Sequence, residues 1–352
     1  MIGVDTALII VPGALIINND SLPKVDIIIP VSNGSRFIDN CIKSLENQTY
    51  NNINVYIVAD SNSTDDTIEK LSSLTSTITD IEIIVRDEKT TVSEARNIGL
   101  WNSNNDIVWF LDIDDYVYPT FLEEMVNILV NNNADIVFCN LFLEKNEIIP
   151  EIPVKGYNTK LFDNYTALGS FDSLPIYPWA HIQKREIFEN KETEFYNTGT
   201  TEDLDQIIHE LVFAKKVCYY NKPLYLYYKR KKSSSMIDRQ KDADAIELIA
   251  ERTIPFVKNN SPDNFHSFRF KMAERFMRQI AYVKYSSYKR IYKKSKMTNI
   301  IREIPDKTIE MKVFLRSKLL YYIIVYPFTH WIWDNKTGLW DKSIDNSDNN
   351  HS

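Results

Sequence analysis

Residues 107–115 read Ile-Val-Trp-Phe-Leu-Asp-Ile-Asp-Asp, and this segment carries the strongest signal of fold class. Its first five residues are β-branched, aromatic or otherwise apolar, which is typical of a buried strand. Three carboxylates follow within four residues, at Asp112, Asp114 and Asp115. Like charges at this spacing repel one another, so such a cluster is costly unless a positive group lies against it. The segment therefore predicts a buried strand that ends in a polar site.

The same strand pattern recurs on both sides of this segment. Short apolar runs predict further strands at 25–31, 53–59, 81–86 and 135–140. Apolar residues at helical spacing predict helices between them, at 35–48, 64–74, 93–102 and 120–131. Strands that alternate with helices indicate an α/β fold with a mainly parallel, doubly wound sheet. Ligands of such sheets bind beyond the carboxyl ends of the strands, so the loops after the first, second and fourth strands are expected to carry the chemistry.

The overall composition is that of a globular protein. The chain has 352 residues, 44% hydrophobic and 25% charged, and a net charge of -7. Eight glycines are too few for a collagen-like or glycine-rich repeat fold. The three cysteines, Cys41, Cys139 and Cys218, lie far apart and form no CxxC pair. This spacing disfavours a disulfide scaffold or a zinc ribbon, and it predicts reduced thiols in a cytoplasmic protein.

Charge is distributed unevenly along the chain. Residues 241–330 carry a net charge of +9, whereas the first 240 residues carry -14. An acidic N-terminal part followed by a basic C-terminal part predicts two modules. We expect four segments, namely an N-terminal extension at 1–20, an α/β domain at 21–240, a helical basic module at 241–342 and a disordered polar tail at 343–352.

Membrane contact is one interpretation of the basic module. The apolar runs Ala7–Ile17 and Leu319–Trp333 are both too short to span a bilayer. The second follows a basic segment, Arg269–Lys318, and is rich in Tyr and Trp. Residues 265–333 therefore predict either peripheral contact with an anionic membrane surface or a solvated helix face followed by a buried core helix. The sequence pI near 5.4 disfavours a nucleic-acid partner.

The acidic segment has the spacing of a metal site. In an extended chain Asp112 and Asp114 point to the same side, because the side-chain period is two. Oxygen ligands suit a hard cation such as Mg²⁺ or Mn²⁺. Such an ion would bridge the carboxylates and a diphosphate and neutralise a phosphate leaving group. The alternative interpretation is a solvated acidic turn.

Other polar segments accompany the acidic one in a definite order. They are Ile29–Gly34 (IPVSNG), Val58–Asp65 (VADSNSTD), Ser93–Gly99 (SEARNIG), Pro178–His181 (PWAH) and Thr201–Leu204 (TEDL). In order and spacing this set resembles the family 2 glycosyltransferases of the GT-A fold, over about two thirds of the chain. The resemblance implies a nucleotide-sugar-dependent transferase that acts with inversion of the anomeric carbon.

The resemblance implies roles for residues of the donor site. Pro30 and Val31 would open the nucleotide pocket, and Asp60 would contact the base of the nucleotide sugar. Arg96 and Asn97 match the ARNxG helix that lines the donor site near the diphosphate.

The remaining matches concern the metal and the base. Asp112 and Asp114 match the DxD motif, and Asp114 would be the direct metal ligand. Asp203, in the pair Glu202-Asp203, matches the acid that serves as catalytic base. An inverting transfer needs such a carboxylate to take the proton of the attacking hydroxyl. The alternative for the pair Glu202-Asp203 is a helix start favoured by the macrodipole.

The chain departs from the family pattern at several positions. Asn62 follows Ser61 where many members have a second acid and then glycine, and His181 stands where many have lysine. Arg230 lies in a basic run that would close over the donor, or in a solvated loop. Trp179 and Tyr177 are either sugar-stacking residues or core aromatic residues. His181 is either a substrate contact or a buried histidine.

The function that these observations favour is transfer of a sugar from a UDP-sugar, with Mn²⁺ or Mg²⁺, to a glycan or lipid-linked acceptor. We expect the reaction to serve surface polysaccharide or glycoconjugate synthesis at the cytoplasmic face of the membrane. Two alternatives remain open. One is a metal-dependent nucleotidyltransferase, and the other is a non-catalytic GT-A subunit that binds glycans.

Overall fold

The computed structural model describes residues 22–144, 149–169, 171–198, 201–228, 239–280, 331–334 and 339–342. The expectations for the extension at 1–20, for Arg230 and for the tail at 343–352 lie outside these residues. So does most of the proposed membrane-contact segment.

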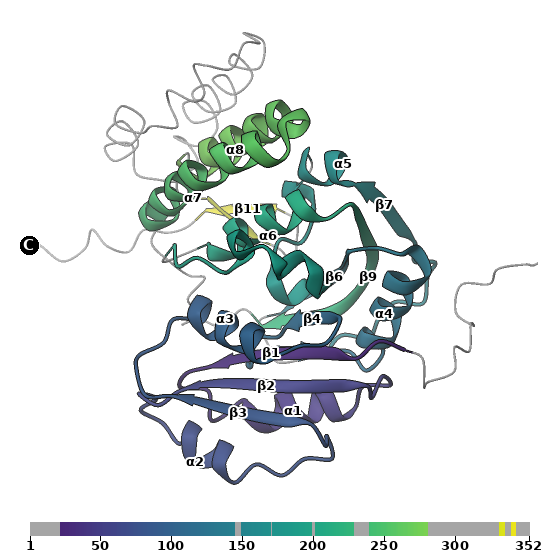
Figure 1. Ribbon diagram of the computed structural model, residues 1–352, viewed down its shortest axis with the longest axis vertical. Helices are drawn as coiled ribbons and strands as arrows, with labels where there is room; N and C mark the ends of the chain where they lie inside the picture. The colour runs from purple at the N-terminus through teal and green to yellow at the C-terminus, as the bar shows by residue number, and fades with distance from the viewer. Residues whose placement is uncertain are drawn as a thin grey trace, which may run out of the picture.

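A mixed sheet forms the centre of the described structure (Figure 1). Its strands are β1 (Val25–Val31), β2 (Ile53–Asp60), β3 (Ile81–Arg86), β4 (Ile107–Phe110), β5 (Tyr116–Val117), β6 (Ile136–Glu144), β7 (Thr159–Asp163), β8 (His181–Lys184) and β9 (Lys216–Tyr228). They lie in the order β3-β2-β1-β4-β8-β6-β9-β5, with β7 paired to β9. The first four strands of this order are mutually parallel, and β8 is antiparallel to both of its neighbours. The prediction of a mainly parallel α/β sheet is confirmed.

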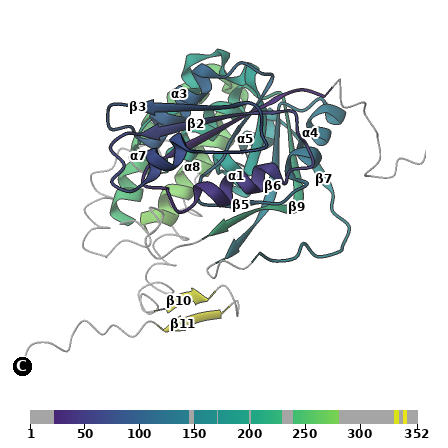
Figure 2. The same cartoon turned by 90° about the horizontal axis from the view of Figure 1, so that it is seen from below.

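Helices cover both faces of this sheet (Figure 2). The helices are α1 (Ile38–Glu46), α2 (Thr67–Ser72), α3 (Val92–Asn102), α4 (Phe121–Asn132), α5 (Asn164–Gly169), α6 (Glu202–Phe213), α7 (Arg239–Asn260) and α8 (Phe265–Ile280). Alternation along β1 explains the layering. Ile27 and Ile29 pack with α1 and α4, whereas Ile28 packs on the other face with Leu100 of α3. This arrangement is the doubly wound fold that the alternating pattern predicts.

The first two helices begin later than the sequence pattern predicts, because the residues before them join two loops. The carboxylate of Asp65 accepts a hydrogen bond from the backbone N–H of Ser35, at 3.0 Å. The side-chain oxygen of Asn33 accepts one from the N–H of Thr64, at 2.7 Å. Helix α1 starts at Ile38 rather than near Ser35, and α2 starts at Thr67. The loops after β1 and β2 are thereby held side by side.

Gly99 lets α3 approach β1 closely, and its replacement tests that packing. An added Cβ would lie 2.4 Å from Cγ2 of Ile28, which is fully buried. We expect Gly99→Ala to lower the free energy of unfolding by about 1–2 kcal/mol, because overpacking outweighs the gain in helix propensity. Urea unfolding would measure the change. Gly156→Ala is the control, since nothing lies within 4 Å of its added Cβ. Equal effects of the two substitutions would contradict this account of the packing.

The C-terminal helices pack onto the second half of the sheet. One apolar cluster contains Phe138 of β6, Ile207 of α6, Ile249 of α7 and Phe268 of α8. Residues on both sides of the expected boundary at 240 therefore share a core. Further along, β10 (Trp331–Asp334) pairs antiparallel with β11 (Leu339–Lys342). These two strands lie inside the module at 241–342 that we expected to be helical.

Two smaller expectations concern the cysteines and the membrane. All three cysteines are free thiols, and all three are buried. Within the described ranges, no helix combines the length and the apolar character needed to cross a bilayer.

Candidate active site

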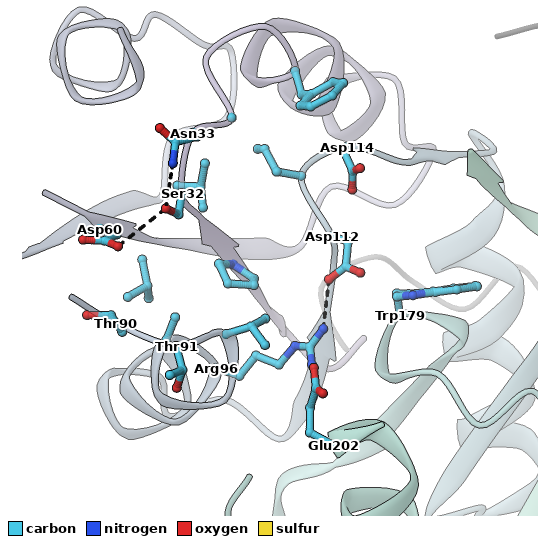
Figure 3. Close-up of a pocket in the computed structure, with 18 of the residues that line it drawn as sticks. Ser32, Asn33, Asp60, Thr90, Thr91, Arg96, Asp112, Asp114, Trp179 and Glu202 are labelled. Atoms are coloured by element: carbon cyan, nitrogen blue, oxygen red, sulfur yellow. Dashed lines mark hydrogen bonds and ion pairs between the residues drawn. The ribbon is translucent and has the colours of Figure 1, made fainter. Parts of the chain in front are cut away.

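A cavity of about 430 Å³ opens where β1, β2 and β4 end (Figure 3). Its walls come from the loops after these strands, the start of α3, the PWAH segment and the first turn of α6. The cavity gathers most of the residues that the sequence singled out, namely Pro30, Val31, Asp60, Arg96, Asp112, Asp114, Trp179, Glu202 and Asp203. Segments more than 170 residues apart in the chain thus meet at one site.

Arg96 is the centre of the site's charge network. Its Nη2 lies 3.0 Å from Oδ1 of Asp112, and its Nη1 lies 3.2 Å from Oδ1 of Asp203. Glu202 is more distant, with Oε1 at 3.9 Å from Nη1. The Arg96 side chain is only 3% exposed, so its charge requires these partners. Arg96 therefore connects the acidic loop to the start of α6, and Figure 3 shows it between Asp112 and Glu202.

Asp203 has the environment of a general base. It occupies the first turn of α6, which begins after Thr201 in a left-handed conformation (φ 58°). Burial raises the pKa of Asp203 to about 7, while the positive charge of Arg96 opposes that rise. About a quarter of the side chain, 26%, stays exposed. A carboxylate that titrates near neutral pH and reaches a cavity can accept a proton there.

The three acids of the loop after β4 lie in different environments. Asp112 and Asp114 line the cavity. Asp115 is buried, and its carboxylate accepts hydrogen bonds from the Tyr225 hydroxyl at 3.0 Å and the Tyr228 N–H at 3.2 Å. Asp115 thus anchors the loop to β9, and the two acids on either side of Ile113 face the ligand space.

A divalent cation fits the chemistry of this loop. Among the described residues, no three His, Cys, Asp or Glu side chains gather into a metal-binding group. Mg²⁺ is usually held by one or two carboxylates together with phosphate oxygens of the substrate. Asp112 and Asp114 supply that number of carboxylates, so the loop suits an ion that arrives with a diphosphate.

Asp60 is fixed at the other end of the cavity. The backbone N–H and the side-chain amide of Asn62 donate hydrogen bonds to its Oδ1, at 2.9 and 3.0 Å. These bonds lower the pKa of Asp60, which therefore remains an ionised acceptor. Asn62 is one of the positions that depart from the family pattern. Its two hydrogen bonds hold the Asp60 carboxylate in place.

Asn97 does not line the cavity, unlike its neighbour Arg96. Its side-chain oxygen accepts the backbone N–H of Phe195 at 2.8 Å, and its amide donates to the Phe195 carbonyl at 2.9 Å. Asn97 thus holds the loop against which Arg96 packs, and its expected contact with the donor stays a prediction.

The PWAH segment contributes aromatic rings rather than a catalytic histidine. His181 is 2% exposed and does not line the cavity. Its Nε2 lies 3.1 Å from Oε2 of Glu210, and its Nδ1 lies 3.0 Å from the carbonyl oxygen of Tyr177. Trp179 lines the cavity but is 3% exposed, and its ring stacks with those of Tyr177 and Tyr225. These contacts agree with the interpretation of His181 as a buried histidine and of Trp179 as a core aromatic residue.

Sequence reasoning missed Thr90 and Thr91, which line the cavity beside Asp60. The Thr91 side chain accepts from the Glu94 N–H, and the Glu94 carboxylate accepts from the Thr91 N–H, which makes a capping box. The T-x-x-E spacing was the available signal, and it would have placed the start of α3 at the edge of the site.

A doubly wound sheet with an acidic loop after β4 and a half-buried acid at the start of α6 is the arrangement of the GT-A glycosyltransferases. Residues 26–199 match the model of the family described as glycosyl transferase family 2. Residues 26–199 therefore form a domain of this family.

Two curated relatives illustrate the range of the family. The chain is 28% identical to the glycosyltransferase GlyA of Streptococcus pneumoniae over 65% of its own length and 34% of GlyA, so it spans about a third of that relative. It is 24% identical to the Campylobacter jejuni GalNAc(5)-diNAcBac-PP-undecaprenol beta-1,3-glucosyltransferase, over 77% of its own length and 87% of that enzyme.

Solved structures share the fold. Staphylococcus aureus TarS 1–349 in complex with UDP-GlcNAc superposes with a TM-score of 0.62 at 14% identity, covering 92% of this chain and 97% of TarS 1–349. The Pyrobaculum calidifontis mannosyltransferase PcManGT in complex with GDP-Man and Mn²⁺ gives a TM-score of 0.50 at 15% identity, covering 87% and 88%.

Proposed function

We propose that this chain is an inverting glycosyltransferase that moves one sugar from a UDP-sugar to a glycan or lipid-linked acceptor. The observation that carries the proposal is the bridge from Asp112 through Arg96 to Asp203 in one cavity. It brings the acidic loop, which would bind the diphosphate, beside a carboxylate whose pKa burial raises to about 7. Family membership favours this reaction over a nucleotidyltransferase.

The donor would lie along the cavity from Asp60 to the acidic loop. Pro30 and Val31 supply apolar surface for the nucleotide, and Asp60 is an ionised acceptor for N–H groups of the base. Asp114 and Asp112 would hold Mn²⁺ or Mg²⁺. When bound, that ion neutralises the charge that develops on the departing diphosphate. The PcManGT complex with Mn²⁺ supports this assignment.

Asp203 would act on the acceptor. Its carboxylate takes the proton of the acceptor hydroxyl as the oxygen attacks the anomeric carbon and the bond to the diphosphate breaks. Arg96 holds Asp203 in position and keeps part of it ionised at neutral pH. Attack from the face opposite the leaving group inverts the anomeric configuration.

The acceptor class follows from the relatives. The printed name of the Campylobacter jejuni enzyme describes transfer to a lipid-linked oligosaccharide. We therefore propose surface polysaccharide or glycoconjugate synthesis, at the cytoplasmic face of the membrane. Contact of residues 265–333 with anionic lipid remains part of this proposal.

Titration calorimetry with nucleoside diphosphates tests the donor assignment. We expect UDP to bind more tightly than GDP, CDP or dTDP, and only in the presence of Mn²⁺ or Mg²⁺. If this protein bound none of the four nucleoside diphosphates, with or without metal, the result would contradict the proposal.

The pH dependence of the rate tests the role of Arg96. Because Asp203 must be ionised to act as base, the rate should be low below its pKa and rise as the pH passes about 7. Arg96→Gln removes a positive charge that favours the ionised form, so the inflection should move to higher pH. Arg96→Lys keeps the charge and should move it less. An inflection that stays in place or moves down in Arg96→Gln would refute this role.

A further inference from the structure

One tyrosine presents an exposed aromatic ring in the cavity that also holds Asp203. Tyr177 lines the cavity and is 43% exposed, whereas its stacking partner Trp179 is 3% exposed. The two rings are parallel, with centroids 4.6 Å apart and an interplanar angle of 1°. Trp179 stacks in turn on Tyr225 and Tyr227. Tyr177 is therefore the exposed end of a rigid aromatic stack.

The stack lies at the end of the cavity that holds the candidate base. Figure 3 shows Asp60 and Thr90 on one side, and Trp179 and Glu202 on the other. Tyr177 and Asp203 both line this cavity, and the negative charge of Asp203 adds to the effect of burial in raising the pKa of Tyr177. An aromatic face beside a base is suited to the apolar C–H face of a sugar ring.

A buried pair holds this stack against the helix that carries Asp203. The His181 ring bonds the Tyr177 carbonyl with Nδ1 and the Glu210 carboxylate with Nε2. Glu210 lies on α6, seven residues after Asp203, and also accepts the side-chain amide of Gln206 at 3.1 Å. His181 and Glu210 are 2% and 1% exposed. His181 and Glu210 thus link the backbone of Tyr177 to α6, the helix that carries Asp203, through buried polar contacts.

We propose that Tyr177 is the platform on which the pyranose ring of the acceptor stacks, and that His181 and Glu210 are positioning residues that fix this platform relative to Asp203. The proposal rests on the glycosyltransferase function proposed above. It names a cyclic sugar, rather than an acyclic polyol, as the acceptor group nearest the base.

Saturation-transfer NMR tests the platform without needing turnover. The probes are millimolar methyl pyranosides and ribitol, with the full chain, in the presence and absence of UDP and Mg²⁺. We expect transfer to the ring protons of at least one pyranoside and none to ribitol. Tyr177→Leu should weaken pyranoside binding about tenfold. Tyr196→Leu is the control, because Tyr196 is also 43% exposed but does not line the cavity.

The outcomes separate this inference from the function on which it rests. Equal transfer in Tyr177→Leu and wild type, or no transfer to any pyranoside in wild type, overturns the platform. Failure of UDP to bind in the same samples contradicts the proposed function instead, while the pyranoside signal without UDP still reports on Tyr177.

Variants of the buried pair test its positioning role. In Glu210→Gln the new amide can donate to Nε2 of a neutral His181, so we expect the pyranoside signal to persist. His181→Phe removes both ring nitrogens and should weaken the signal about as much as Tyr177→Leu. If His181→Phe does not fold, His181→Gln, which keeps one donor, should give an intermediate signal. An unchanged signal in a folded His181 variant overturns the positioning role.

Discussion

Asp203→Asn should lower kcat by about 10²–10⁴-fold, because the amide cannot take the acceptor proton. The substitution keeps the size of the side chain and an oxygen that can accept from Arg96, which lies 3.2 Å away. Nucleotide affinity should therefore stay within about threefold of wild type. Release of nucleoside diphosphate measures kcat, and calorimetry measures the affinity.

The neighbouring acid supplies a matched control for this variant. Glu202 lies on the same helix turn and also lines the cavity, but its carboxylate is 3.9 Å from Arg96. Glu202→Gln should reduce kcat by less than about tenfold, because it leaves the base in place. If Glu202→Gln were the more damaging of the two, the base would have to be reassigned.

The second large effect is expected at the acidic loop. Asp114→Asn should reduce kcat by about 10³-fold, because metal neutralisation of a leaving diphosphate is worth several kcal/mol. The metal concentration needed for half-maximal rate should rise in the same variant. A metal titration of the rate, in Mn²⁺ and in Mg²⁺, checks both statements.

Asp115→Asn removes a carboxyl group from the same loop without touching the cavity. Asp115 is buried and accepts hydrogen bonds from Tyr225 and Tyr228, and burial together with its neighbouring acids raises its pKa well above the usual range. We expect its replacement to affect stability more than metal dependence. Equal changes in metal dependence for Asp114→Asn and Asp115→Asn would contradict the assignment of Asp114, rather than Asp115, as the metal ligand.

Local patterns were sufficient to predict the strands β1 to β4 and β6 and the location of the candidate site, whereas β5, β7, β8 and β9 were not predicted. Apolar runs and helical spacing are read over short windows, and parallel strands bring the loops that follow them to one edge. For this reason the acidic loop and Asp60 were found together. The connection of Arg96 to Asp203 was not predictable in the same way, because 107 residues separate them and only packing of α6 brings them together.

The orientation of individual side chains was less accessible to sequence. Arg96 and Asn97 are adjacent in one motif, yet one faces the cavity and the other bonds the backbone of Phe195. The sequence left His181 open between a substrate contact and a buried histidine, because its partner Glu210 lies 29 residues away on another element. Such assignments depend on tertiary contacts that no short window contains.

The most direct test of the central claim is turnover of a panel of nucleotide sugars with Mn²⁺ or Mg²⁺, followed by release of the nucleoside diphosphate. We predict metal-dependent release from one donor, a UDP-sugar, at a rate that rises as the pH passes about 7. No release from any donor, together with no binding of any nucleoside diphosphate, would contradict the claim that this cavity transfers sugars.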